Sequence, residues 1–172
     1  MNPCAHPLTR TSQRRVSVGS VPHLELSTSV AASAERCFDV SVDVELHTRS
    51  TGAREEIVGD VRSGLIGPGE EVTWRAWHFG VPFRMTSRIA EYDRPGMFVD
   101  QQVRGPFGAW RHEHRFEEAD GHTVMRDVVN FRSPLGPLGA LVDRLVLRRY
   151  MTRVLETRNT VLRVAAESSG QH

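Results

Sequence analysis

The chain contains no lysine, so all 22 of its basic residues are arginine. This absence excludes Schiff-base chemistry and a catalytic lysine. Cysteine is scarce as well, because Cys4 and Cys37 offer neither a disulfide framework nor a zinc site built on thiolates. The formal net charge of +1 creates no field of one sign, so we expect no nucleic-acid partner.

Long apolar runs are also missing. No segment reaches the roughly 20 apolar residues of a transmembrane helix, and residues 1–20 lack the apolar run of a signal peptide. We therefore predict a cytoplasmic protein that does not insert into a membrane. The length of 172 residues suits a single domain. We predict this domain at 22–167, with a disordered basic tail at 1–21 and a disordered C-terminus at 168–172.

The period of the apolar residues predicts both strands and helices. His23–Val30 alternates as a strand does, and Ser33 can cap a helix, so 33–48 should form one or two short helices. Strand-like runs with glycine- and proline-rich turns follow, which predicts an antiparallel meander. These runs lie at about 54–62, 70–78, 83–93, 97–104, 109–118 and 122–132.

A helical period covers 137–167, but its apolar stripe changes face, so we predict a break or kink at 146–149. The polar face beyond the break is expected to be solvated, with a docking surface as the alternative. The second stripe contains Leu147, Met151, Val154, Val161 and Ala165, and the polar face contains Arg148, Arg149, Thr152, Arg153, Glu156 and Arg163.

Together these elements predict an α+β fold. A seven-stranded curved antiparallel sheet should surround a long, kinked C-terminal helix, with two short helices after the first strand. Because the sheet curves, helix and sheet need not touch along their whole length. A cavity between them is the natural ligand site.

The most informative stretch is the predicted hairpin at 109–132. Asp120-Gly121, flanked by alternating residues, is a strong signal for a two-residue type I′ turn. If these two residues form the whole loop, the register of the two strands is fixed. On one face it pairs Trp110 with Phe131, His112 with Val129, His114 with Asp127 and Phe116 with Met125.

His112, His114 and Asp127 form a polar group within an aromatic and apolar face. Buried polar groups need partners, and three roles stay open. The group can be a structural cluster that fixes strand register, it can contact a polar group of a ligand, or it can transfer a proton while Asp127 orients His114. Asp127→Asn should change ligand affinity or turnover in the functional cases and mainly stability in the structural case.

Further wall residues depend on strand phases that the sequence leaves undecided. Trp74 and His78 share a face of 70–78, and this face would line the cavity if it points inward. The opposite phase would turn Trp77 inward and so leave it less exposed. The inward face of 97–104 is undecided for the same reason. The predicted ligand-binding residues are Trp74, His78, Trp110, His112, His114, Asp127 and Phe131.

A metal site is a weaker alternative. His112-x-His114 followed by Glu118 is similar to a first cupin motif, but the preceding glycine, Gly105, stands one residue too far away and a second motif is missing. Two histidines and one carboxylate could still form a facial triad. The chain lacks a nucleophile elbow, a dinucleotide fingerprint and a P-loop. We therefore expect no metal and no other cofactor.

Four segments and the order of the elements carry a family resemblance. The segments are Gly105–Phe107, Trp110–Phe116, Met125–Asp127 and Ser133–Gly136. They resemble the bacterial polyketide cyclase/dehydrase-like branch of the SRPBCC (START / Bet v 1-like) superfamily, over roughly 22–166. The resemblance implies a helix-grip fold with a deep hydrophobic cavity. This superfamily includes lipid carriers, hormone receptors and aromatase/cyclases, and the resemblance implies no catalytic residue.

Three functions therefore stay open. The first is binding of a small hydrophobic molecule, such as a lipid, a polyketide or an aromatic metabolite. The alternative is a cyclase or dehydratase that moves a proton through His112, His114 or Asp127 without metal or nucleotide cofactor. The third is an interaction module that uses the arginine face of the last helix. Ligand retention, a change in ligand mass or absorbance, and a co-purifying protein would distinguish them.

Overall fold

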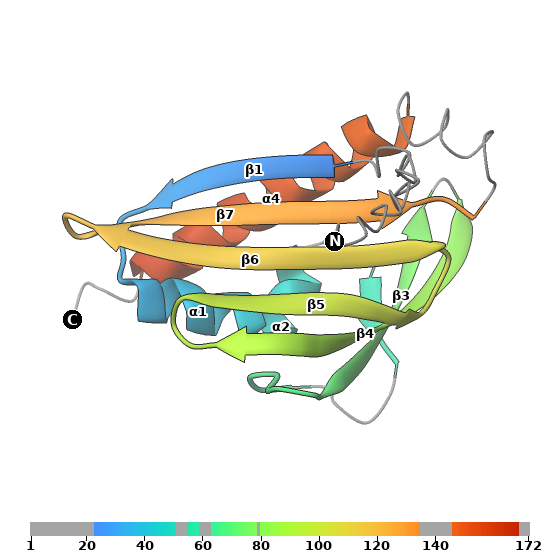
Figure 1. Ribbon diagram of the computed structural model, residues 1–172, viewed down its shortest axis with the longest axis horizontal. Helices are drawn as coiled ribbons and strands as arrows, with labels where there is room; N and C mark the ends of the chain where they lie inside the picture. The colour runs from blue at the N-terminus through green and yellow to red at the C-terminus, as the bar shows by residue number, and fades with distance from the viewer. Residues whose placement is uncertain (1–22, 51–54, 59–62, 79, 135–145, 169–172) are drawn as a thin grey trace, which may run out of the picture.

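The computed structural model describes residues 23–50, 55–58, 63–78, 80–134 and 146–168. The layers are a curved sheet and helices on one side of it (Figure 1). In chain order the elements are β1 (His23–Val30), α1 (Ala34–Val42), α2 (Val44–Ser50), β2 (Glu55–Ile57), β3 (Glu71–His78), β4 (Val81–Asp93), β5 (Met97–Arg104), β6 (Ala109–Ala119), β7 (His122–Arg132) and α4 (Arg148–Ser168).

The sheet has seven strands in the order β1-β7-β6-β5-β4-β3-β2, and neighbouring strands are antiparallel. Strands β2 to β7 form the predicted meander, and β1 closes against β7. Two register shifts in β4, at Thr86/Ser87 and at Ile89/Glu91, are β-bulge positions that bend a strand. The predicted α+β helix-grip fold is confirmed.

The β6–β7 hairpin has the predicted register. His114 lies opposite Asp127, and Trp110 lies opposite Phe131. Asp120 has a φ of 53° and Gly121 a φ of 75°, as a type I′ turn requires at both central positions. This register places the two histidines and the aspartate on the inner face.

Helix α1 begins where the sequence predicts. The Ser33 hydroxyl accepts a 3.3 Å hydrogen bond from the Arg36 N–H. Glu118 accepts a 2.7 Å hydrogen bond from the N–H of Ala34, which ties the helix to β6. Within the helix, Phe38 is fully buried and meets three aromatic rings edge-on. These rings belong to Tyr92, Phe98 and Phe116, at centroid distances of 5.1, 5.4 and 5.5 Å.

Helix α4 lies against β1, α1 and α2. The predicted apolar stripe faces inward and is half-buried, with Val161 and Ala165 packed on the core, and the most buried positions lie beside it. These positions are Leu155, Arg158, Asn159, Leu162 and Ala166. The apolar pattern misses part of this face because Arg158 and Asn159 are polar. The predicted polar face is exposed at Arg148, Arg149, Arg153, Glu156 and Arg163, whereas Thr152 is half-buried.

Several predicted features lie partly outside the residues that the structure describes. Val146 and Leu147 form a π-helical turn at the predicted break, while 137–145 lie outside the described residues. The predicted tail at 1–21 also lies outside them. Ser168 is the last residue of α4, and 169–172 are not described. Within the described ranges, no helix combines the length and the apolar character needed to cross a membrane.

Candidate functional site

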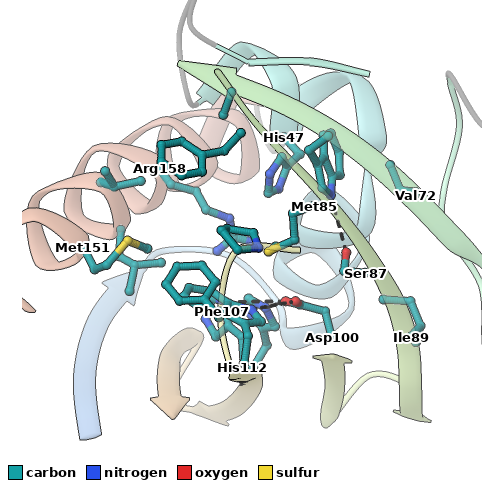
Figure 2. Close-up of a pocket in the computed structure, with 18 of the residues that line it drawn as sticks. His47, Val72, Met85, Ser87, Ile89, Asp100, Phe107, His112, Met151 and Arg158 are labelled. Atoms are coloured by element: carbon teal, nitrogen blue, oxygen red, sulfur yellow. Dashed lines mark hydrogen bonds and ion pairs between the residues drawn. The ribbon is translucent and has the colours of Figure 1, made fainter. Parts of the chain in front are cut away.

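A cavity of about 460 Å³ lies between the inner face of the sheet and the helices. Its wall is mainly apolar and includes side chains from β3, β4, β5 and α4. Figure 2 shows Val72, Met85, Ile89, Phe107 and Met151 around this space. Helix α4 contacts the sheet mainly at β1, and the cavity occupies the space between α4 and the inner faces of β3, β4 and β5.

The structure divides the predicted site residues into two groups. Trp74, Trp110, His112 and His114 line the cavity. Asp127 and Phe131 do not line it: they are 2% and 0% exposed and lie behind the wall. The side chain of the seventh predicted residue, His78, lies outside the described part of the chain. The phase of β3 is thereby settled, because Trp74 faces the cavity and Trp77 is exposed.

One carboxylate oxygen holds both histidines. Asp127 Oδ1 lies 2.8 Å from His112 Nε2 and 2.9 Å from His114 Nδ1. The imidazole rings lie against each other with centroids 3.7 Å apart. The predicted pairing of Asp127 with His114 is present, and His112 shares it. Asp127 therefore orients two rings toward the cavity.

A fourth residue, Asp100 of β5, completes this group. Its Oδ2 lies 3.3 Å from His114 Nε2 and 3.5 Å from His112 Nδ1. Its Oδ1 accepts a 3.2 Å hydrogen bond from the Trp110 indole N–H. The sequence left the phase of this strand open, and the structure turns Asp100 inward. Figure 2 shows Asp100 and His112 together at one end of the cavity.

Helix α4 supplies the remaining partners of Asp127. Asn159 Nδ2 donates a 2.6 Å hydrogen bond to Asp127 Oδ2 and another of 3.2 Å to Thr28. Arg158 Nη1 lies 3.6 Å from Asp127 Oδ1, which places a positive charge beside the buried carboxylate. Arg158 also lines the cavity. The buried negative charge is thus paired and hydrogen-bonded, as burial demands.

Burial and the neighbouring charges set the protonation of the group. Burial, and then the charge of His114, lower the pKa of His112 to about 4, against the hydrogen bond to Asp127. Burial alone would raise the pKa of Asp127, but the hydrogen bonds from His112 and His114 hold it well below its usual value. Burial would likewise raise the pKa of Asp100, but the hydrogen bond from His114 helps to hold it below its usual value. At neutral pH the site therefore presents a neutral His112 and two carboxylates.

A second polar pair lies on another wall of the cavity. The Trp74 indole N–H donates a 3.4 Å hydrogen bond to the Ser87 hydroxyl. The ring of His47 in α2 lies on Trp74 with a centroid distance of 4.2 Å. Both His47 and Ser87 line the cavity. Ser87 and His47 therefore hold the Trp74 ring in place on this wall of the cavity.

Family comparison agrees with this architecture. A model of the family described as polyketide cyclase / dehydrase and lipid transport matches residues 21–167. The chain belongs to this family. Its membership confirms the predicted resemblance to SRPBCC proteins.

Solved structures share the fold of this family member at low sequence identity. TTHA0849 of Thermus thermophilus has a TM-score of 0.70 at 16% identity, covering 86% of this chain and 99% of that one. A START superfamily protein of Mycobacterium smegmatis has a TM-score of 0.64 at 13% identity, with 85% and 97% covered. Major latex-like protein 151 of Panax ginseng has a TM-score of 0.58 at 11% identity, covering 84% of this chain and 96% of that one. A search of the curated proteins finds no match.

Sequence reasoning missed three polar residues of this polyketide cyclase/dehydrase family domain. The sequence leaves the face of Asp100 open, because the phase of 97–104 is ambiguous, and gives no apolar signal at Arg158 or Asn159. Their spacing does carry a signal, since both lie one helical turn from the apolar Leu155 and Leu162. Conversely, Glu118 does not join the histidines, because it caps α1. Asp100 is the carboxylate that lies beside them.

Proposed function

We propose that this chain binds a small hydrophobic molecule carrying a polar group, such as a lipid, a polyketide or an aromatic metabolite. The observation that supports this most is an apolar cavity with one polar end. Its volume of about 460 Å³ falls in the range of small-molecule sites. Trp74 and Trp110 supply aromatic wall, and the polar end consists of Asp100, His112 and His114.

The protonation of the polar end favours one kind of ligand group. Asp100 is ionised and accepts hydrogen bonds, and the neutral imidazole of His112, whose Nε2–H is directed to Asp127, offers its Nδ1 as an acceptor. The site therefore favours a ligand hydroxyl or phenol, which donates a hydrogen bond. A ligand carboxylate would lie beside Asp100 and be repelled. We expect hydroxylated aromatic or polyketide-like ligands to bind better than free fatty acids.

Native mass spectrometry of freshly purified protein tests this function. A discrete added mass that leaves on denaturation, followed by identification of the released molecule, would support it. Titration with a phenolic probe such as 2-naphthol should quench the fluorescence of Trp74 or Trp110 and saturate. An unliganded mass together with no saturable response to naphthols or to fatty acids would overturn the proposal.

A cyclase or dehydratase is the second candidate. It is favoured by the 2.9 Å contact of Asp127 with His114, which orients an imidazole facing a cavity as a general base is oriented. Incubation with polyketide-like substrates distinguishes it from binding, because only an enzyme changes the mass or absorbance of the ligand. His114→Gln should then abolish the change while ligand retention persists.

A further inference from the structure

Three potential metal ligands converge at the polar end of the cavity. Asp100 Oδ2 comes from β5, and His112 Nδ1 and His114 Nε2 come from β6. One ligand atom from each of these three residues lies within 4.8 Å of the other two. All three residues line the cavity, so the point between them is open to a molecule bound there.

Two edges of this triangle have lengths that fit a metal site. Zn²⁺ bonds to imidazole nitrogen and carboxylate oxygen at about 2.0–2.2 Å, so two ligands of a tetrahedral ion stand roughly 3.3–3.5 Å apart. Asp100 Oδ2 lies 3.3 Å from His114 Nε2 and 3.5 Å from His112 Nδ1. The third edge, between one ring nitrogen of each histidine, is within 4.8 Å and would close by a tilt of the rings.

Each ligand atom is oriented by a second residue. Asp127 Oδ1 binds the far nitrogen of both rings, at 2.8 Å on His112 and 2.9 Å on His114. The other ring nitrogens, His112 Nδ1 and His114 Nε2, face Asp100 Oδ2 at 3.5 and 3.3 Å, and the contact of His114 is a hydrogen bond. A divalent ion would replace the proton of that bond, because metal binding releases protons from the ligands. Two ring nitrogens and one carboxylate oxygen would then face the same cation.

The outer residues have the form of a metal-supporting shell. Histidine ligands in metal sites usually donate their other N–H to a carboxylate, which fixes the tautomer and the ring. Asp127 does this for both rings and is itself held by Asn159 at 2.6 Å. The Trp110 indole fixes Asp100 through its other oxygen, Oδ1, and leaves Oδ2 for the site.

We propose that Asp100, His112 and His114 bind a divalent transition-metal ion, with Zn²⁺ as the best-fitting ion. Two imidazole nitrogens and one carboxylate oxygen suit Zn²⁺ or Fe²⁺ and disfavour the harder Mg²⁺ and Ca²⁺. Three protein ligands leave at least one coordination position, and it faces the cavity. This site departs from the expectation of no metal, and it does not depend on the identity of the organic ligand.

Zinc binding to the full chain tests the site. After EDTA treatment and gel filtration, isothermal titration with ZnCl₂ should give one saturable site per chain, and MgCl₂ should give none. Asp100→Asn should weaken Zn²⁺ binding at least 100-fold, because it removes a charged ligand. Asp127→Asn should weaken it about 10- to 100-fold, because it frees the rings without removing a ligand.

Two controls separate this site from other histidines and from unfolding. His122→Ala removes an exposed histidine of the same hairpin and should leave the affinity unchanged. Far-UV circular dichroism should show that each variant is folded, and Co²⁺ should give a visible spectrum in the wild type that Asp100→Asn loses. The proposal is overturned if the wild type shows no saturable Zn²⁺ site, or if Zn²⁺ binding persists unchanged in both Asp100→Asn and His112→Gln.

Discussion

Asn159 of α4 donates a 2.6 Å hydrogen bond to Asp127 of β7, and both side chains are almost fully buried. This bond joins the long helix to the sheet through polar groups. The same carboxylate holds the two histidines of the cavity, so the helix, the sheet and the polar end share one hydrogen-bonded network. The position of α4 and the orientation of the imidazoles are therefore coupled.

Removing Asn159 should destabilise the fold. In Asn159→Ala, Asp127 Oδ2 loses its donor in a buried environment, so we expect the free energy of unfolding to fall by about 2–3 kcal/mol. Urea denaturation followed by circular dichroism measures this. Thr160→Ala, on the exposed face of the same turn, should change stability by no more than about 0.5 kcal/mol. Equal losses in the two variants would contradict a role for the Asn159 bond.

The hairpin turn gives a second test of stability, remote from the cavity. Gly121 has a φ of 75°, a region that disfavours a side chain. Gly121→Ala should cost about 1 kcal/mol or more, although a Cβ there meets no atom within 4 Å. Gly108→Ala is the matched control, because its Cβ would make only ordinary contacts at 3.5 Å and its φ is not positive. Thermal unfolding of both variants would show whether conformation, and not space, decides the loss.

The hairpin also shows what the sequence could predict. A two-residue loop fixes every pair along both strands, so the Asp120-Gly121 signal was enough to place His114 opposite Asp127. The strands of the meander and the capped first helix are equally local, because alternation and Ser33 lie in the chain itself. These features needed no knowledge of distant contacts.

The other half of the site depends on contacts that no local pattern records. Asp100 points inward because it pairs with His112 across β5 and β6 and so shares its face, and the Trp110 indole donates a hydrogen bond to it. Arg158 and Asn159 are buried because polar partners lie opposite them, the Asp127 carboxylate foremost. A polar residue on a helix is ordinarily exposed, so the sequence identifies the apolar, half-buried part of the inner face of α4 and misses these two residues.

Filling the cavity should weaken ligand binding without damaging the fold. Ala76 is buried and lines the cavity from β3. Ala76→Phe places a ring inside the space, so we expect the affinity for 2-naphthol or for the natural ligand to fall at least tenfold. Ala109→Phe, at an exposed strand position, should leave binding unchanged. Fluorescence titration measures both, and unaltered affinity in Ala76→Phe would place the ligand elsewhere.

Acid should destabilise the metal-free protein through His112. The pKa of its imidazole is about 4 in the folded chain, against 6.5 for a free histidine. Between these two pH values the unfolded chain binds a proton that the folded chain does not, so stability is complete above pH 6.5 and declines as the pH falls toward 4. The loss is at most about 3 kcal/mol. The lowered pKa values of Asp100 and Asp127 act in the same direction at still lower pH.

Urea denaturation in EDTA at pH 7.5, 6.5, 5.5 and 4.5 measures this dependence. The charged and titratable groups that face His112 are His114, Asp100 and Asp127, and Arg158 lies beside Asp127. His112→Gln keeps a hydrogen-bond donor near Asp127 but cannot titrate, so its stability should vary less between pH 6.5 and 4.5 than that of the wild type. His122→Ala should keep the wild-type slope. If His112→Gln and the wild type lose stability in parallel over this range, the acid sensitivity arises from another group and the burial of a neutral His112 does not govern it.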